Sequence, residues 1–99
     1  MQNETKFTPG PWFTKREGWS TVYVEARIDG GMIQEVAACG PTDAGQDQQQ
    51  ANARLIAAAP ELYDALAQWQ AADREYDPRE RMNARRARDA ALAKARGEA

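Results

Sequence analysis

The sequence predicts an α+β protein in which a three-stranded antiparallel β-sheet is followed by helices that pack on one face of it. Apolar and polar residues alternate along residues 22–28, and the Asp29-Gly30-Gly31 segment that follows is typical of a hairpin turn. From Ala51 to Trp69, apolar residues recur every three or four positions, which predicts helix. We expect strands at about 11–16, 19–28 and 32–39, and helices at about 43–59, 60–75 and 78–96.

The register of the second hairpin has two solutions. A three-residue loop pairs Val24 with Val36 on one apolar face, but it sets Glu25 opposite Glu35, a like-charge pair. A two-residue loop avoids that pair but turns Glu35 toward the apolar face. Because burying a carboxylate costs more than solvating a like-charge pair, we expect the three-residue loop.

One apolar stripe runs through the first two predicted helices, and we expect it to cover the sheet. Pro60 lies inside the stripe, so the helix either kinks there or a second helix begins with Pro60 in its first turn. The third helix begins at Asp77-Pro78, a capping residue followed by proline, and ends at Gly97. The stripe consists of Ala51, Leu55, Ala58, Leu62, Leu66 and Trp69.

The length of 99 residues predicts one domain with a small core. We expect residues 1–10 to be a flexible arm, 11–76 to be the α+β domain, and 77–99 to be an Ala/Arg-rich helix. Leu, Ile, Val and Phe number only twelve, so a homodimer is as reasonable an expectation as a monomer.

The composition argues against an enzyme. The sequence has no histidine, one serine (Ser20) and one cysteine (Cys39), so no nucleophile has a histidine to activate it and no Cys/His zinc site can form within one chain. Gly-rich phosphate loops are also missing. We therefore expect no catalytic residue, no metal and no cofactor. With neither an apolar leader nor a membrane-spanning stretch, the expected location is the cytoplasm.

The last predicted helix is basic and follows an acidic segment. Residues 78–99 carry seven Lys/Arg and three acidic residues, whereas 61–77 carry five acidic residues and one arginine. The arginines are candidates for binding an acidic protein surface, or the phosphates of a nucleotide or nucleic acid. Alternatively, the two segments neutralise each other or the helix presents a solvated charged face. The candidate partner-binding arginines are Arg81, Arg85, Arg86 and Arg88.

Two aromatic residues complete the candidate site. Trp19 and Tyr23 can stack bases or anchor a protein interface, although core packing is the alternative for both. We expect Trp12 in the core. A stripe of small residues on the last helix predicts close packing on the preceding helix, or a dimer; it consists of Ala84, Ala87, Ala91 and Ala95.

Two stretches together resemble a known group of proteins. Residues 8–12 read TPGPW and residues 51–66 read ANARLIAAAPELYDAL, with Ile33-Gln-Glu-Val36 between them. This combination resembles small, largely uncharacterised proteins encoded by bacteriophages and prophages, except that Tyr63-Asp64 stand where Leu-Glu is commoner. The resemblance covers about residues 8–69 and transfers no catalytic residue. It implies a phage accessory gene, and such proteins often block host machinery.

Three functions remain as hypotheses. The first is a non-catalytic phage protein that inhibits a host defence system, of the anti-CRISPR type, by binding a host defence complex in the host cytoplasm. The second is a protein that sequesters a signalling nucleotide or contacts guide RNA or DNA. The third is a structural or regulatory phage protein that assembles with itself through the Ala-rich helix.

Overall fold

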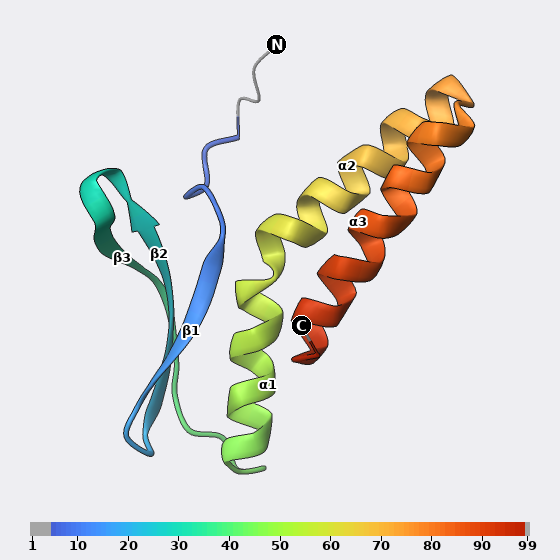
Figure 1. Cartoon of the computed structure of the whole chain (residues 1–99). Coiled ribbons are helices and arrows are strands. Elements are labelled where there is room, and N and C mark those ends of the chain that lie inside the picture. Colours follow the sequence, from blue (N-terminus) through green and yellow to red (C-terminus); the bar gives the residue numbers. More distant parts are fainter. Residues whose placement is uncertain (1–4, 99) are drawn as a thin grey trace.

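A computed structural model describes residues 5–98 and confirms the α+β fold. One antiparallel sheet has the strand order β1-β2-β3, and three helices follow it (Figure 1). Helix α1 lies along the sheet, whereas α2 and α3 form an antiparallel hairpin that extends away from it (Figure 1). The elements are β1 (Trp12–Glu17), β2 (Thr21–Ile28), β3 (Met32–Cys39), α1 (Gln46–Ala57), α2 (Ala59–Glu75) and α3 (Pro78–Arg96).

The chain breaks between α1 and α2, so the first two predicted helices are separate. Ala58 closes α1 by donating its N–H to the carbonyl of Arg54 at 3.0 Å, and Pro60 lies in the first turn of α2. Proline is tolerated there because the first N–H groups of a helix need no intrahelical acceptor. Helix α3 has the predicted bounds: the Asp77 carboxylate accepts from the N–H of Arg79 at 2.9 Å, and Gly97 ends the helix with φ +79°.

The predicted three-residue turn is confirmed, since Glu25 pairs with Glu35 across β2 and β3. The expected pairing of Val24 with Val36 is wrong, because a bulge lies in the ladder and Val24 pairs with Ala37. The extra residue lets both Val36 and Ala37 pack against the core. Sequence alternation alone does not show such an insertion.

The core between the sheet and α1 is made of small side chains and one tryptophan. Trp12 is buried, as expected, and the apolar side chains that α1 buries are alanines, together with the polar side chain of Gln49. Alanine lets the helix axis approach the sheet closely. The cluster consists of Trp12, Val22, Val24, Ala26, Ala53 and Ala57.

The expectation that the apolar stripe covers the sheet is wrong. Leu55 is 56% exposed and Leu66 is 71% exposed, whereas Ala53 and Ala57 face the strands. The sheet contacts the alanine face of α1, and Leu55, about half a turn round the same helix from Ala53 and Ala57, points elsewhere. The α2–α3 hairpin packs on itself and on α1.

The expected flexible arm, residues 1–10, falls partly on residues 1–4, which lie outside the described residues. Beyond them, Phe7 packs edge-to-face on Trp12 and on Tyr63, with ring centroids 6.4 Å and 5.2 Å apart. The segment around Phe7 therefore lies against the junction of α1 and α2.

Candidate functional site

The α2–α3 hairpin is held by a seam of alanines. Ala65 and Ala72 on α2, and Ala84 and Ala91 on α3, are all buried and are spaced seven residues apart on each helix. Two of these seam residues belong to the predicted small-residue stripe, which therefore packs on the preceding helix within the chain. The seam leaves the larger side chains along the two sides of the hairpin.

The opposite charges of the two helices partly meet across the hairpin. Arg81 lies 3.6 Å from Asp73 and over the ring of Tyr76, and Lys94 donates to Glu61 at 3.0 Å. These pairs neutralise part of the acidic segment with part of the basic one, as one of the sequence alternatives anticipated. Because Arg81 and Asp73 are substantially exposed, their pair adds little stability.

The remaining arginines of α3 are open to solvent. Arg88 lies over the ring of Trp69, 5.9 Å from its centroid, and pairs with its neighbour Asp89. Arg86 donates to the sulfur of Met82 at 3.7 Å, and neither Arg85 nor Arg86 makes an ion pair with any residue between 5 and 98. Charged donors without partners are available to bind an acidic surface.

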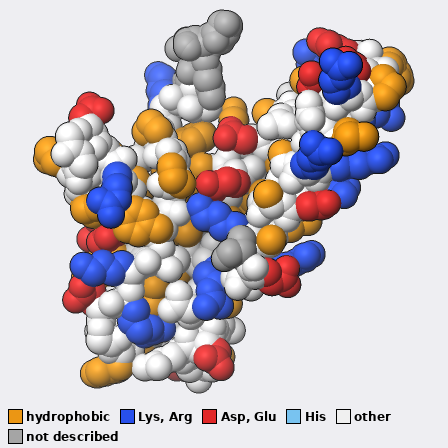
Figure 2. Space-filling view, in the orientation of Figure 1, with side chains coloured by type: hydrophobic (Ala, Val, Ile, Leu, Met, Phe, Trp, Pro, Cys, Tyr) orange, Lys and Arg blue, Asp and Glu red, His pale blue; other side chains and the backbone are white. Residues whose placement is uncertain are grey.

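Apolar side chains lie beside these arginines on the same side of the hairpin. Leu62, Leu66 and Trp69 follow one another at spacings of four and three on α2, and the contact of Trp69 with Arg88 places this row next to α3. Figure 2 shows basic and hydrophobic side chains interspersed along the hairpin. We call this surface the hairpin flank; it comprises Leu62, Leu66, Trp69, Arg81, Arg85 and Arg88.

The structure does not bring Trp19 and Tyr23 to the hairpin flank. Trp19 is 73% exposed in the β1–β2 turn, which lies at the end of the sheet away from the hairpin tip (Figure 1). Tyr23 alternates with the buried Val22 and Val24, so it lies on the sheet face opposite α1. The predicted partner-binding residues therefore divide among three separate surfaces.

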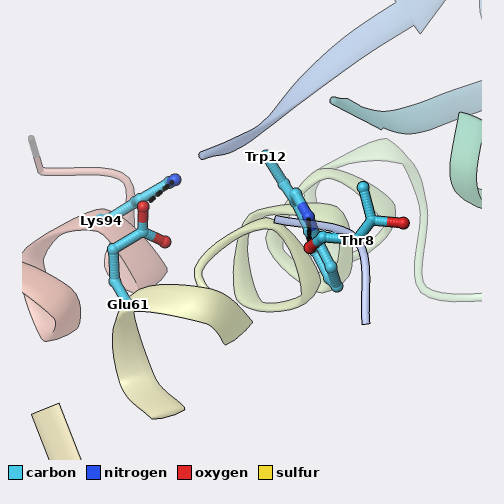
Figure 3. A network of polar contacts seen from close by, with 4 residues as sticks. All are labelled: Thr8, Trp12, Glu61 and Lys94. Carbon is cyan, nitrogen blue, oxygen red and sulfur yellow. Dashed lines mark hydrogen bonds and ion pairs between the residues drawn. The ribbon is translucent and has the colours of Figure 1, made fainter. Parts of the chain in front are cut away.

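A second candidate site lies where the N-terminal segment meets the α1–α2 junction. Trp12 donates its indole N–H to the carbonyl of Thr8 at 3.0 Å (Figure 3), which folds the TPGPW segment back on itself. A Cβ added to Gly10 would lie 3.0 Å from Cβ of Pro60, so glycine permits this close approach. The two stretches that carried the resemblance are thus in contact.

Two adjoining cavities open at this junction. The first, of about 220 Å³, is lined by Phe7, Trp12, Ala59, Pro60 and Tyr63. The second, of about 550 Å³, shares Phe7 and Pro60 with the first and carries two carboxylates, Glu61 and Asp64. We call the pair of cavities the junction groove. No sequence pattern indicates this groove, because Phe7 and Tyr63 are far apart in the chain.

Glu61 contributes one of the two carboxylates that line the groove. Its Oε2 binds the ammonium group of Lys94 (Figure 3), but its buried Oε1 has no hydrogen-bond partner among residues 5–98. Asp64 adds a second, exposed carboxylate nearby. Two carboxylates against one ammonium group leave the groove favourable for a cation.

Within residues 5–98 no cluster of three or more His, Cys, Asp or Glu side chains could hold a metal ion. Glu25 and Glu35 are directly opposite on neighbouring strands, as predicted, and Cys39 is half-buried with a free thiol. None of the helices in the described part of the chain is long and apolar enough to cross a bilayer.

The fold and its surfaces define a small α+β protein with two candidate interaction surfaces. A family model described as Salmonella phage P22 protein Y8K6 matches residues 1–99, so the chain belongs to this family of bacteriophage proteins. The match includes the Arg-rich helix, which the resemblance over residues 8–69 left out. No curated protein and no solved structure matches the chain.

Proposed function

We propose that this phage protein is a non-catalytic inhibitor of a host defence system, of the anti-CRISPR type, which binds a host protein in the host cytoplasm through the hairpin flank. The observation that carries the proposal is the hairpin flank itself: Leu66 is largely exposed in the same row as Trp69, which contacts Arg88, and Arg85 has no ion-pair partner among residues 5–98. Exposed apolar side chains next to arginines are typical of protein interfaces. Membership of a phage family supplies the biological context.

The flank is suited to a partner that is acidic and apolar. Leu66 and Trp69 offer apolar area, and Arg85 and Arg88 offer donors that can bind carboxylates in pairs. The alanine seam holds both helices, so the flank is presented by rigid elements and loses little conformational freedom on binding. A composition without histidine further favours binding over catalysis.

The double charge reversal R85E/R86E, which changes Arg85 of the hairpin flank and its exposed neighbour Arg86, tests the proposal. Expression of the unmodified protein in cells with an active CRISPR–Cas system is expected to restore plaque formation by a targeted phage. R85E/R86E is expected to lower plaquing by about tenfold or more, because reversed charges repel an acidic partner. Both side chains are exposed, so the circular dichroism spectrum and the melting temperature of the variant should remain those of the unmodified protein.

The matched control is K6E/K15E, which makes the same change in net charge at exposed positions outside the hairpin. It is expected to plaque like the unmodified protein. Equal plaquing by both double variants would remove the hairpin flank from the mechanism. A failure of the unmodified protein to protect phage against any of several defence systems, CRISPR–Cas included, would contradict the proposal as a whole. A nucleotide that co-purifies with the protein and is lost in R85E/R86E would replace it with nucleotide sequestration.

A further inference from the structure

The junction groove combines an apolar cavity with an acidic one, and it shares no residue with the hairpin flank. Phe7 and Pro60 line both cavities, so a single extended ligand can reach from one into the other. We propose that the groove binds an extended, proline-containing basic segment of a partner protein, with a proline ring in the apolar cavity and a lysine or arginine against Glu61 and Asp64.

The apolar cavity has walls that suit a proline ring. The ring of Phe7 is nearly perpendicular to the rings of Trp12 and Tyr63, with interplanar angles of 86° and 73°. The three aromatic rings therefore line the cavity in different orientations. Aromatic rings are the usual contacts of proline in grooves that bind polyproline-type segments. Such segments are already extended in solution, so binding costs them little conformational entropy.

Two walls of this cavity, Trp12 and Pro60, are held in place before any ligand binds. The Trp12 indole N–H is held by the Thr8 carbonyl, and Gly10 lies against Pro60. Trp12 also belongs to the main core, so its ring has little freedom to collapse into the cavity. A cavity that is formed in advance binds more tightly than one that must open.

The acidic cavity selects the charge of the ligand. Glu61 and Asp64 both line this cavity, and a lysine or arginine of the bound segment would lie against these two carboxylates. Lys94 neutralises only one of the two carboxylates that line this cavity, so an acidic segment would be repelled. Figure 2 shows acidic side chains next to hydrophobic ones on this part of the surface.

The test uses a fluorescein-labelled peptide of three Arg-Pro-Pro repeats and the full chain, with binding measured by fluorescence anisotropy. Peptides of Glu-Pro-Pro repeats and of Arg-Ala-Ala repeats are the ligand controls. Each is expected to bind at least about tenfold more weakly than the Arg-Pro-Pro peptide. In a ¹⁵N spectrum, addition of the Arg-Pro-Pro peptide is expected to shift the indole N–H signal of Trp12 more than that of Trp19.

Two variants and two matched controls locate the site. Y63A removes one wall and D64K reverses one charge, and each is expected to weaken peptide binding by about fivefold or more. L66A and E75K make comparable changes on the same helix outside the groove and should bind like the unmodified protein. R85E/R86E should also bind normally, which separates this site from the hairpin flank.

Three results would overturn the inference. The first is no binding of the Arg-Pro-Pro peptide at about 1 mM, a concentration that still detects weak complexes. The second is equal binding of the Arg-Ala-Ala peptide, which would indicate attraction by charge alone. The third is normal binding by Y63A and D64K, which would place the peptide elsewhere on the surface.

Discussion

Gln49 shows how much one polar residue contributes to this small core. Its side chain is 1% exposed, and its Nε2 donates to the carbonyls of Ser20 and Cys39, each at 2.9 Å. Ser20 precedes β2 and Cys39 ends β3, so one amide group ties α1 to both strands. In the sequence, Gln49 lies inside a run of three glutamines that gives no sign of burial.

Replacing Gln49 by alanine is expected to lower the free energy of unfolding by about 1–3 kcal/mol, since two carbonyl groups lose their donor and a cavity forms. The measurement is urea denaturation followed by circular dichroism. Gln48→Ala is the matched control, because Gln48 is the exposed neighbour on the same turn. Equal stabilities of the two variants would show that the Gln49 hydrogen bonds contribute nothing net.

The pairing of α2 with α3 depends on side-chain size more than on hydrophobicity. The four seam alanines bury little area each, but they let the helices approach closely along their length. Of the ion pairs beside the seam, Arg81–Asp73 is exposed and contributes little, whereas Lys94–Glu61 is half-buried. The seam is therefore sensitive to larger side chains.

Ala91→Leu is expected to destabilise the protein by about 1–3 kcal/mol, because the added side chain forces the helices apart. Thermal denaturation monitored by circular dichroism measures the effect. Ala90→Leu is the control: Ala90 is exposed on the same helix, and its replacement should change stability by at most about 0.5 kcal/mol. If Ala91→Leu lowers stability no more than Ala90→Leu does, close packing at the alanine seam is not what holds the two helices together.

At the scale of elements, the number, type and order of strands and helices follow from the sequence. Alternation along residues 22–28, the Asp29-Gly30-Gly31 turn, and the Asp77-Pro78 start are local signals, and each is confirmed. The bulge at Val36, opposite Val24 and Glu25, is different because it depends on which side chains of β3 reach the core. Local patterns therefore predict elements better than the faces that they bury.

The molecule as a whole is elongated, with extents of 47 × 33 × 18 Å. The sheet and α1 form one end, and the hairpin tip around Tyr76 forms the other (Figure 1). The tip buries no large apolar side chain, whereas β2 is buried on one face along most of its length. Stability is therefore distributed unevenly along the long axis.

Hydrogen exchange is expected to follow this division. Amides of residues 73–81, at the hairpin tip, should exchange faster than those of 22–26 and 50–57, because few buried contacts oppose local opening at the tip. Exchange measured by mass spectrometry on the unmodified chain tests this expectation. Uniform protection along the hairpin would show instead that α2 and α3 unfold only together with the sheet.

The sequence by itself determined the α+β class, the antiparallel strand order, the three-residue turn and the bounds of α3, since all of these rest on interactions between residues close in the chain. The sequence also shows that the chain has no histidine and that its last two segments carry opposite net charges. Only the tertiary structure decided that alanines rather than leucines face the sheet, that Trp19 and Tyr23 lie apart from the arginines, and that Phe7 meets Tyr63. Each of these features depends on how closely two backbone segments approach each other. That distance is set jointly by the sizes of side chains that are far apart in the sequence.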